Sequence, residues 1–178
     1  MGLHRRLAQR RRVRRERQPL HLRRRRTLAA LRVHRRQGHY EEADPFYRQA
    51  LELRLGELGP RSVEVAASYN SLAILSWNRG RFDEAEQLYL QALAIWEPAY
   101  GEDHADVAKG LNNLALLYHH QKRYAEAQAM YTRAVGIYER ILGAEHPRLG
   151  AALNNLALVV HEQGREVTSL GDDEVPAQ

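Results

Sequence analysis

The feature that most constrains the fold of this chain is a repeat of 42 residues. The six letters LNNLAL occur at 111–116 and again at 153–158. A step of 42 gives 14 identities between 59–100 and 101–142, and 11 identities in 23 positions between 101–123 and 143–165. A fixed period of this length is typical of arrays in which each repeat packs mainly on its neighbours. We therefore expect a stacked array rather than one globular core.

Each repeat reads as two helices. One face of the first helix, over 104–121, collects the apolar residues Val107, Ala108, Leu111, Leu114, Ala115 and Tyr118. One face of the second helix collects Tyr124, Ala127, Tyr131, Ala134, Val135 and Tyr138. Both sets follow the three- and four-residue spacing of an amphipathic helix. The small alanines are expected to let helix backbones approach closely, with tyrosines filling the volume around them.

Glycines mark the expected helix ends, because glycine readily adopts the left-handed conformation that closes many helices. The glycines expected between repeats are Gly59, Gly101 and Gly143. The turn inside each repeat is expected at Gly80, Lys122 and Gly164. The residues expected near the starts of the first helices are Ser62, His104 and His146. Pro147 then falls at a first helical position, where its missing N–H is tolerated.

These residues resemble a known pattern. Leu111, Leu114, Ala115 and Tyr118, followed by Ala127 and Tyr131, resemble the tetratricopeptide motif, whose usual period is 34 residues. The longer period resembles the kinesin-light-chain branch of that family, over roughly residues 38–165. The resemblance implies an all-α, right-handed helix-turn-helix solenoid of about three repeats. It also implies a protein-interaction scaffold that binds an extended peptide or a helix in a concave groove.

The ends depart from the pattern. We expect an arginine-rich, disordered leader at 1–19, a degenerate repeat at 20–58, repeats at 59–100 and 101–142, a half repeat at 143–165 and an acidic tail at 166–178. Residues 1–36 hold 15 arginines and one acidic residue, a formal charge of +14. Residues 37–178 hold 12 basic and 21 acidic residues, a formal charge of −9. An alternative function is therefore weak binding of nucleic acid or an anionic surface through residues 1–36.

We make two different predictions for the asparagines of the repeat, one for those facing the groove and one for those between repeats. At about 100° per residue, Lys109, Asn113, Leu116 and His120 lie on the side of the helix opposite the apolar face. The family resemblance implies that this opposite side faces the groove. The candidate groove residues are Lys109, Asn113, His120, Asn155, Asn78, Glu162 and Trp77. The asparagines assigned to structural hydrogen bonds between repeats are Asn70, Asn112 and Asn154. A purely structural role for all five asparagines stays open, since a buried amide with partners needs no ligand.

Other chemistries find no support in the sequence. His119 and His161 occupy equivalent positions, but no carboxylate or cysteine stands at a supporting metal-ligand spacing, so we predict neither a metal nor another cofactor. The chain has no cysteine, and no phosphate-binding loop or nucleophile motif appears, so we predict no enzyme. We expect a cytoplasmic protein without a membrane span. A further alternative is self-association through an apolar face of 146–163 that includes Leu153 and Val160.

Overall fold

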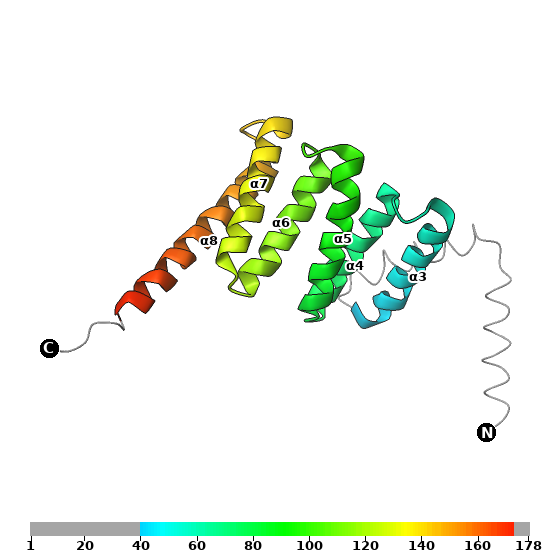
Figure 1. Cartoon of the computed structure of the whole chain (residues 1–178), viewed down its shortest axis with the longest axis horizontal. Helices are drawn as coiled ribbons and strands as arrows, with labels where there is room; N and C mark the ends of the chain where they lie inside the picture. The colour runs from blue at the N-terminus through cyan, green and yellow to red at the C-terminus, as the bar shows by residue number, and fades with distance from the viewer. Residues whose placement is uncertain (1–39, 173–178) are drawn as a thin grey trace, which may run out of the picture. The chain divides into compact units, whose positions relative to one another are not determined.

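The structure, a computed structural model, describes residues 40–172, with side chains to residue 166. The expectations for the leader, for residues 20–39 and for 173–178 therefore lie outside the described residues. The described helices are α3 (Tyr40–Leu58), α4 (Val63–Asn78), α5 (Phe82–Tyr100), α6 (Ala105–His120), α7 (Tyr124–Leu142) and α8 (Pro147–Asp172) (Figure 1). The predicted all-α solenoid of helical hairpins is confirmed.

The chain divides into two compact units, one ending at Leu53 and the other beginning at Arg54. Most of α3 belongs to the first unit, where Ala43 is buried. The second unit holds α4 to α8. In that unit each helix packs on the next one along the chain, so α4 with α5 and α6 with α7 form two successive hairpins.

Small residues allow the helices of the second unit to pack closely. The fully buried alanines of the two hairpins are Ala66, Ala73, Ala85, Ala92, Ala108, Ala115, Ala127 and Ala134. Tyr131 is also fully buried, and burial raises the pKa of its phenol to about 12. Alternating small and large side chains lets facing helices interdigitate without voids. The prediction that tyrosines fill the volume around the buried alanines is confirmed for Tyr118 and Tyr131, whereas Tyr124 is only half-buried.

The turns at Gly80, Gly101, Lys122 and Gly143 lie at the predicted positions. Inside the repeats, Gly80 has a φ of 71° and Lys122 a φ of 60°, both in the left-handed region. Between repeats, Gly101 has φ 80° and ψ 174°, and Gly143 has nearly the same values. This combination lies outside the left-handed helical region and is available essentially to glycine alone. Glycine is therefore required between repeats, while a lysine is tolerated within one.

The first helices begin at side-chain caps. Ser62 accepts a hydrogen bond from the backbone N–H of Val65, at 3.2 Å. The ring nitrogen Nδ1 of His104 accepts from the N–H of Asp106, at 3.1 Å. His146 repeats the contact one period later. Each cap satisfies a backbone donor that the first turn of a helix leaves unpaired.

The prediction that a turn falls at Gly164 is wrong. Helix α8 runs from Pro147 to Asp172 without a break at that glycine. A glycine inside a helix costs about 1 kcal/mol relative to alanine, which the hydrogen bonds of the continuing helix can outweigh. Helix α8, the first helix of the third repeat, has 26 residues. It is thus ten residues longer than α4 and α6, which have 16 residues each.

Candidate functional site

The first helices of the repeats share an inner face. In the described part of the second unit the backbones of α4 and α6, and those of α6 and α8, come into contact, whereas the backbones of α5 and α7 do not and are linked instead through the Arg133–Glu97 ion pair, at 2.9 Å. The first helices are thus closer together than the second helices, so this unit curves with α4, α6 and α8 on its inner side. The concave side expected from the family resemblance is formed by these three helices.

A row of apolar side chains crosses this inner face. Ile74 on α4, Leu116 on α6 and Leu158 on α8 stand 42 residues apart. Their exposed fractions are 39%, 41% and 45%. Leucine and isoleucine are usually buried, so their exposure at the same position of three successive repeats indicates a surface available for contacts rather than a chance result of packing. We call these three residues the hydrophobic row.

Polar side chains flank the hydrophobic row on both sides. Three residues before each row member stand Ser71, Asn113 and Asn155, and four residues after stand Asn78, His120 and Glu162. Some of these groups are already engaged locally. The Ser71 hydroxyl donates to the carbonyl of Ala67 at 2.8 Å, and the Asn78 amide donates to the carbonyl of Ile74 at 2.7 Å. Lys109 lies exposed further toward the start of α6.

One of the predicted groove asparagines makes a contact between repeats. The amide nitrogen of Asn113 donates to the side-chain oxygen of Asn70, at 3.1 Å. Asn70 is only 2% exposed, so the predicted structural hydrogen bond at Asn70 is present, with Asn113 as its donor. The expectation that the Asn113 amide is wholly available to a ligand is corrected, because one amide hydrogen is used.

The remaining asparagines do not separate cleanly into the two predicted classes. Asn112 and Asn155 are half-buried, and Asn154 is exposed. Nothing in the structure assigns a partner to Asn112 or Asn154, so their structural role stays a prediction. The groove role of Asn155 stays a prediction as well.

Trp77 and His120 come together at the boundary between two repeats. The His120 ring packs edge-on against Trp77, with centroids 5.4 Å apart, and lies 4.8 Å from the ring of Phe82. A step of 42 residues carries these three positions onto His119, Glu162 and Tyr124. The same register positions therefore form an aromatic cluster at one repeat boundary and a polar cluster at the next.

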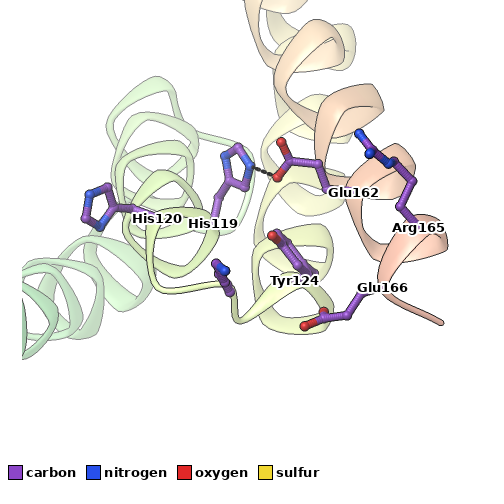
Figure 2. Close-up of a pocket in the computed structure, with 7 residues that line it drawn as sticks. His119, His120, Tyr124, Glu162, Arg165 and Glu166 are labelled. Atoms are coloured by element: carbon purple, nitrogen blue, oxygen red, sulfur yellow. Dashed lines mark hydrogen bonds and ion pairs between the residues drawn. The ribbon is translucent and has the colours of Figure 1, made fainter. Parts of the chain in front are cut away.

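The polar cluster borders a cavity of about 550 Å³ near the start of α7 (Figure 2). His119 and Glu162 point toward each other from α6 and α8, with Nε2 2.7 Å from Oε2 (Figure 2). This contact lowers the pKa of the Glu162 carboxyl. The residues that line the cavity are His119, His120, Lys122, Tyr124, Glu162, Arg165 and Glu166.

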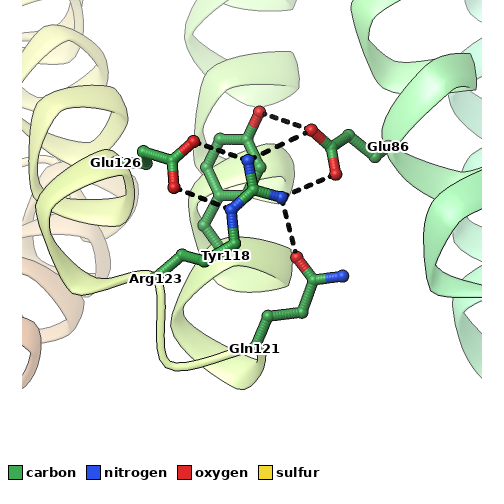
Figure 3. Close-up of polar contacts among 5 residues, drawn as sticks. All are labelled: Glu86, Tyr118, Gln121, Arg123 and Glu126. Atoms are coloured by element: carbon green, nitrogen blue, oxygen red, sulfur yellow. Dashed lines mark hydrogen bonds and ion pairs between the residues drawn. The ribbon is translucent and has the colours of Figure 1, made fainter.

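A second polar cluster joins the two hairpins at the turn between α6 and α7 (Figure 3). The Arg123 guanidinium bridges Glu86 of the preceding repeat, at 2.7 Å, and Glu126 of its own repeat, at 2.5 Å. It also lies 4.0 Å from the centre of the Tyr118 ring. The Tyr118 hydroxyl donates to Glu86 at 3.1 Å, and burial followed by this bond raises the pKa of Tyr118 to about 12.

The Arg123 cluster joins two repeats rather than forming an open binding site, because the Arg123 guanidinium is engaged by both Glu86 and Glu126. Arg81, Arg123 and Arg165 share a register position in the sequence, but this alone does not identify their role. Glu86 and Arg123 are 37 residues apart in the sequence, so no local sequence pattern reveals the pair.

The described residues contain no group of three or more histidine, cysteine or acidic side chains that could hold a metal ion. Among the same residues, no helix combines the length and the apolar character needed to cross a bilayer.

The fold and the inner face together define a helical-repeat array of the kind that binds other proteins. The tetratricopeptide repeat model matches residues 64–139 and 106–168, and a second model of the same repeat matches 28–61. The chain belongs to the tetratricopeptide repeat family, and its fold is similar to that of a putative kinesin light chain with repeats of this kind. Proteins built from these repeats act generally as protein-interaction scaffolds and are generally not enzymes.

Solved structures support the same assignment. BtubC (BKLC) from P. vanneervenii is 25% identical with a TM-score of 0.69, covering 83% of this chain and 64% of its own. A putative kinesin light chain from Podosopora anserina with nearly identical repeats is 22% identical with a TM-score of 0.71, covering 86% and 77%. A single-substitution variant of that Podosopora protein has a TM-score of 0.73. The chain thus spans less than two thirds of BtubC. No curated protein matches the sequence.

Proposed function

We propose that the inner face of α4, α6 and α8 binds an extended segment of a partner protein. The observation that carries this proposal is the hydrophobic row, in which each first helix exposes one large apolar side chain at the same register position. A monomeric protein rarely leaves aligned apolar side chains exposed without an interaction to cover them. The Ser71 hydroxyl can accept from the main chain of such a segment, and the Asn78 and Asn113 amides each keep one hydrogen to donate to it.

The charges of the inner face favour an internal segment over a free carboxyl terminus. A carboxylate needs several cations around it, whereas the positions seven and three residues before each row member and four residues after it hold one cation, Lys109. Glu162 lies on the same face, and it is ionised more readily than an ordinary glutamate because His119 lowers its pKa. A free terminal carboxylate would therefore meet little attraction, so recognition rests on apolar contacts and main-chain hydrogen bonds.

The test compares two exposed leucines in the full-length chain. Leu116→Ser removes the middle member of the hydrophobic row. Leu90→Ser on α5 is the matched control, since Leu90 is 40% exposed and lies outside the inner face. Both variants should keep the melting temperature within a few degrees, because surface changes usually move stability by less than about 0.5 kcal/mol.

The readout is quantitative capture of partner proteins from a lysate of the source cells. Proteins that bind the inner face should be depleted by Leu116→Ser and retained by Leu90→Ser. Equal retention by both variants would show that the inner face is not the binding site.

Self-association is a second candidate, favoured by exposed apolar side chains on α8. Leu153 and Val160 on α8 are each nearly half exposed, although their counterparts Leu111 and Tyr118 on α6 are buried. A second copy of the chain could cover these side chains. Sedimentation across a wide concentration range tests this, and a strict monomer at all concentrations would exclude it.

Two expectations keep their status as predictions. Binding of nucleic acid or an anionic surface through residues 1–36 concerns residues outside the described part of the chain. The predicted cytoplasmic location has no structural test.

A further inference from the structure

We infer that α8 pairs in antiparallel orientation with the α8 of a second copy of this chain, through Gly150, Leu153, Ala157 and Val160. We call these four residues the α8 stripe. This inference rests on the second function proposed above, self-association, and specifies its surface and its geometry. It follows from the exposure of the stripe, the course of α8 beyond it, and the order of small and large residues along it.

The α8 stripe is exposed along its whole length. Leu153 and Val160 are each 46% exposed, and Gly150 and Ala157 are exposed as well. A Cβ atom on Gly150 would have no neighbour within 4 Å. At about 100° per residue, the four residues fall within an arc of about 80° on one side of the helix. They therefore form one continuous apolar surface.

The equivalent stripe of the preceding repeat is buried. Its members on α6 are Ala108, Leu111, Ala115 and Tyr118, none of them more than 7% exposed. Helix α6 packs between α5 and α7. Within the described residues, the backbone of α8 approaches those of α7 and α6 alone (Figure 1). The side of α8 that bears the stripe thus has no covering helix in this part of the chain.

Helix α8 does not lead into a hairpin as the other first helices do. Helices α4 and α6 end before the turns at Gly80 and Lys122, after which α5 and α7 return alongside them. Helix α8 continues through Gly164 to Asp172, which carries it about 12 Å past the position of the turn. A return after Asp172 would be eight residues out of the register of the other hairpins. The stripe is therefore placed for a helix from another molecule.

The α8 stripe is self-complementary when two copies lie antiparallel. Its small residues, Gly150 and Ala157, alternate with its large ones, Leu153 and Val160, in the spacing of a heptad seam. About a two-fold axis near residue 155, Gly150 faces Val160 of the second copy, and Ala157 faces Leu153. Each layer then joins one small and one large residue, which lets facing helices interdigitate. In a parallel pair each residue would face its own copy, so that layers would be alternately crowded and empty.

The stripe differs from that of α6 in the way that close pairing requires. Gly150 stands where α6 has Ala108, and Val160 stands where α6 has Tyr118. Both changes shorten the side chain. Glycine lowers helix propensity, and close approach of another backbone is one of its uses. Two α8 helices can therefore approach each other more closely than a helix could approach an α8 with the α6 residues.

The borders of the stripe agree with a symmetric pair. Asn154 is exposed beside the stripe and lies next to the two-fold axis, so the Asn154 amides of the two copies meet and can both donate and accept. One polar residue beside an apolar seam favours a single register. The two rows that flank the stripe contain no lysine, arginine or acidic residue, since they consist of Pro147, Asn154, His161, Leu149, Leu156 and Gln163.

Sedimentation equilibrium of the full-length chain from about 1 μM to about 1 mM tests the pairing, because dimerisation depends on concentration. A single pair of helices is a small interface, so we expect a dissociation constant on the order of 10–100 μM. Leu153→Glu should raise this constant at least about tenfold, since it buries a carboxylate in the seam. The matched control is Leu90→Glu on α5, where Leu90 is 40% exposed, and it should leave the constant unchanged. Circular dichroism confirms that both variants stay folded.

The orientation is tested with single cysteines, because the chain contains none of its own. Copies with Leu153→Cys, enlarged by a tag, are mixed with copies with Ala157→Cys and oxidised. In the antiparallel pair positions 153 and 157 face each other, so we expect disulfides mainly between the two variants. Disulfides require Cα atoms within about 7 Å, and a parallel pair would instead join each variant to itself. Predominance of such same-variant disulfides would overturn the inference.

The inference and the functions proposed above fail in distinguishable ways. A chain that stays monomeric at the highest concentration excludes self-association and the α8 pair together, and leaves the stripe to a partner other than a second copy. A dimer that Leu153→Glu and Leu90→Glu weaken equally refutes the α8 pair alone. Neither result bears on the inner face, which the capture experiment with Leu116→Ser tests separately.

Discussion

Replacing Gly110 with alanine should destabilise the array, although alanine is the better helix former. A Cβ atom on Gly110 would stand 2.9 Å from Cδ2 of Leu93 and 3.2 Å from Cζ3 of Trp96. Both neighbours are buried on α5. Alanine gains about 1 kcal/mol over glycine inside a helix, and overpacking a core typically costs about 1–3 kcal/mol. We expect a net loss of about 1 kcal/mol in the free energy of unfolding.

Gly136→Ala on α7 is the matched control. The nearest atom to a Cβ there is the guanidinium Nη1 of Arg140, at 3.2 Å, and this exposed side chain can move aside. The control should gain about 0.5–1 kcal/mol from helix propensity alone. Urea unfolding followed by circular dichroism measures both midpoints. A Gly110→Ala variant as stable as Gly136→Ala would refute the close approach of α5 and α6 at this point.

Three further predictions concern polar contacts within and between the repeats. Arg123→Met should lower the free energy of unfolding by about 1–2 kcal/mol, since it removes charge-assisted bonds to Glu86 and Glu126 that are partly screened by solvent; thermal unfolding measures the loss. Arg123 lowers the pKa of the Glu126 carboxyl. The stabilisation that this ion pair provides is therefore present above the unfolded carboxyl pKa of about 4.3 and is lost as the pH falls through the folded pKa. Glu126→Gln should consequently flatten the acid limb of a plot of melting temperature against pH. Asn113→Ala should cost about 1–3 kcal/mol in urea unfolding, because it leaves the buried oxygen of Asn70 without its donor.

The hairpins and their caps were predictable because their signals are local. The apolar spacing that identifies α6 and α7, the capping residue Ser62 and the glycine at Gly101 all act within a few residues of the chain. A step of 42 then transfers each feature to the next repeat. Local chemistry repeated at a fixed interval therefore determined the fold class before any tertiary contact was known.

The asparagine assignment shows where local reasoning stops. A helical wheel gives the direction of Asn113 from its own helix axis but not the position of the neighbouring helix. The structure brings Asn70 of the previous first helix within hydrogen-bonding distance of Asn113. Whether an amide serves a neighbouring repeat or a ligand depends on the rotation and offset of two helices, and neither follows from a single repeat.

Two other features needed the structure for similar reasons. The turn expected at Gly164 does not form, since one glycine disfavours a helix by less than the continuing backbone hydrogen bonds stabilise it. The cavity beside His119 lies where the two repeat boundaries differ: Trp77 and Phe82 pack with His120 at one boundary, whereas the next has the smaller His119 in place of Trp77 and the charged Glu162 in place of His120. Aligning the repeats at a step of 42 residues shows these substitutions in the sequence. Only the packed side chains show that the substitutions leave a cavity.

Site-specific photo-cross-linking tests the central claim most directly, namely that partners bind the inner face of α4, α6 and α8. A photoreactive phenylalanine derivative replaces Leu116 in one form of the full-length chain and Leu90 in another, and each form is irradiated in a lysate of the source cells. We predict discrete cross-linked partner proteins from position 116 and none of the same partners from position 90. The same cross-linked partners from both positions, or partners from position 90 alone, would contradict the claim.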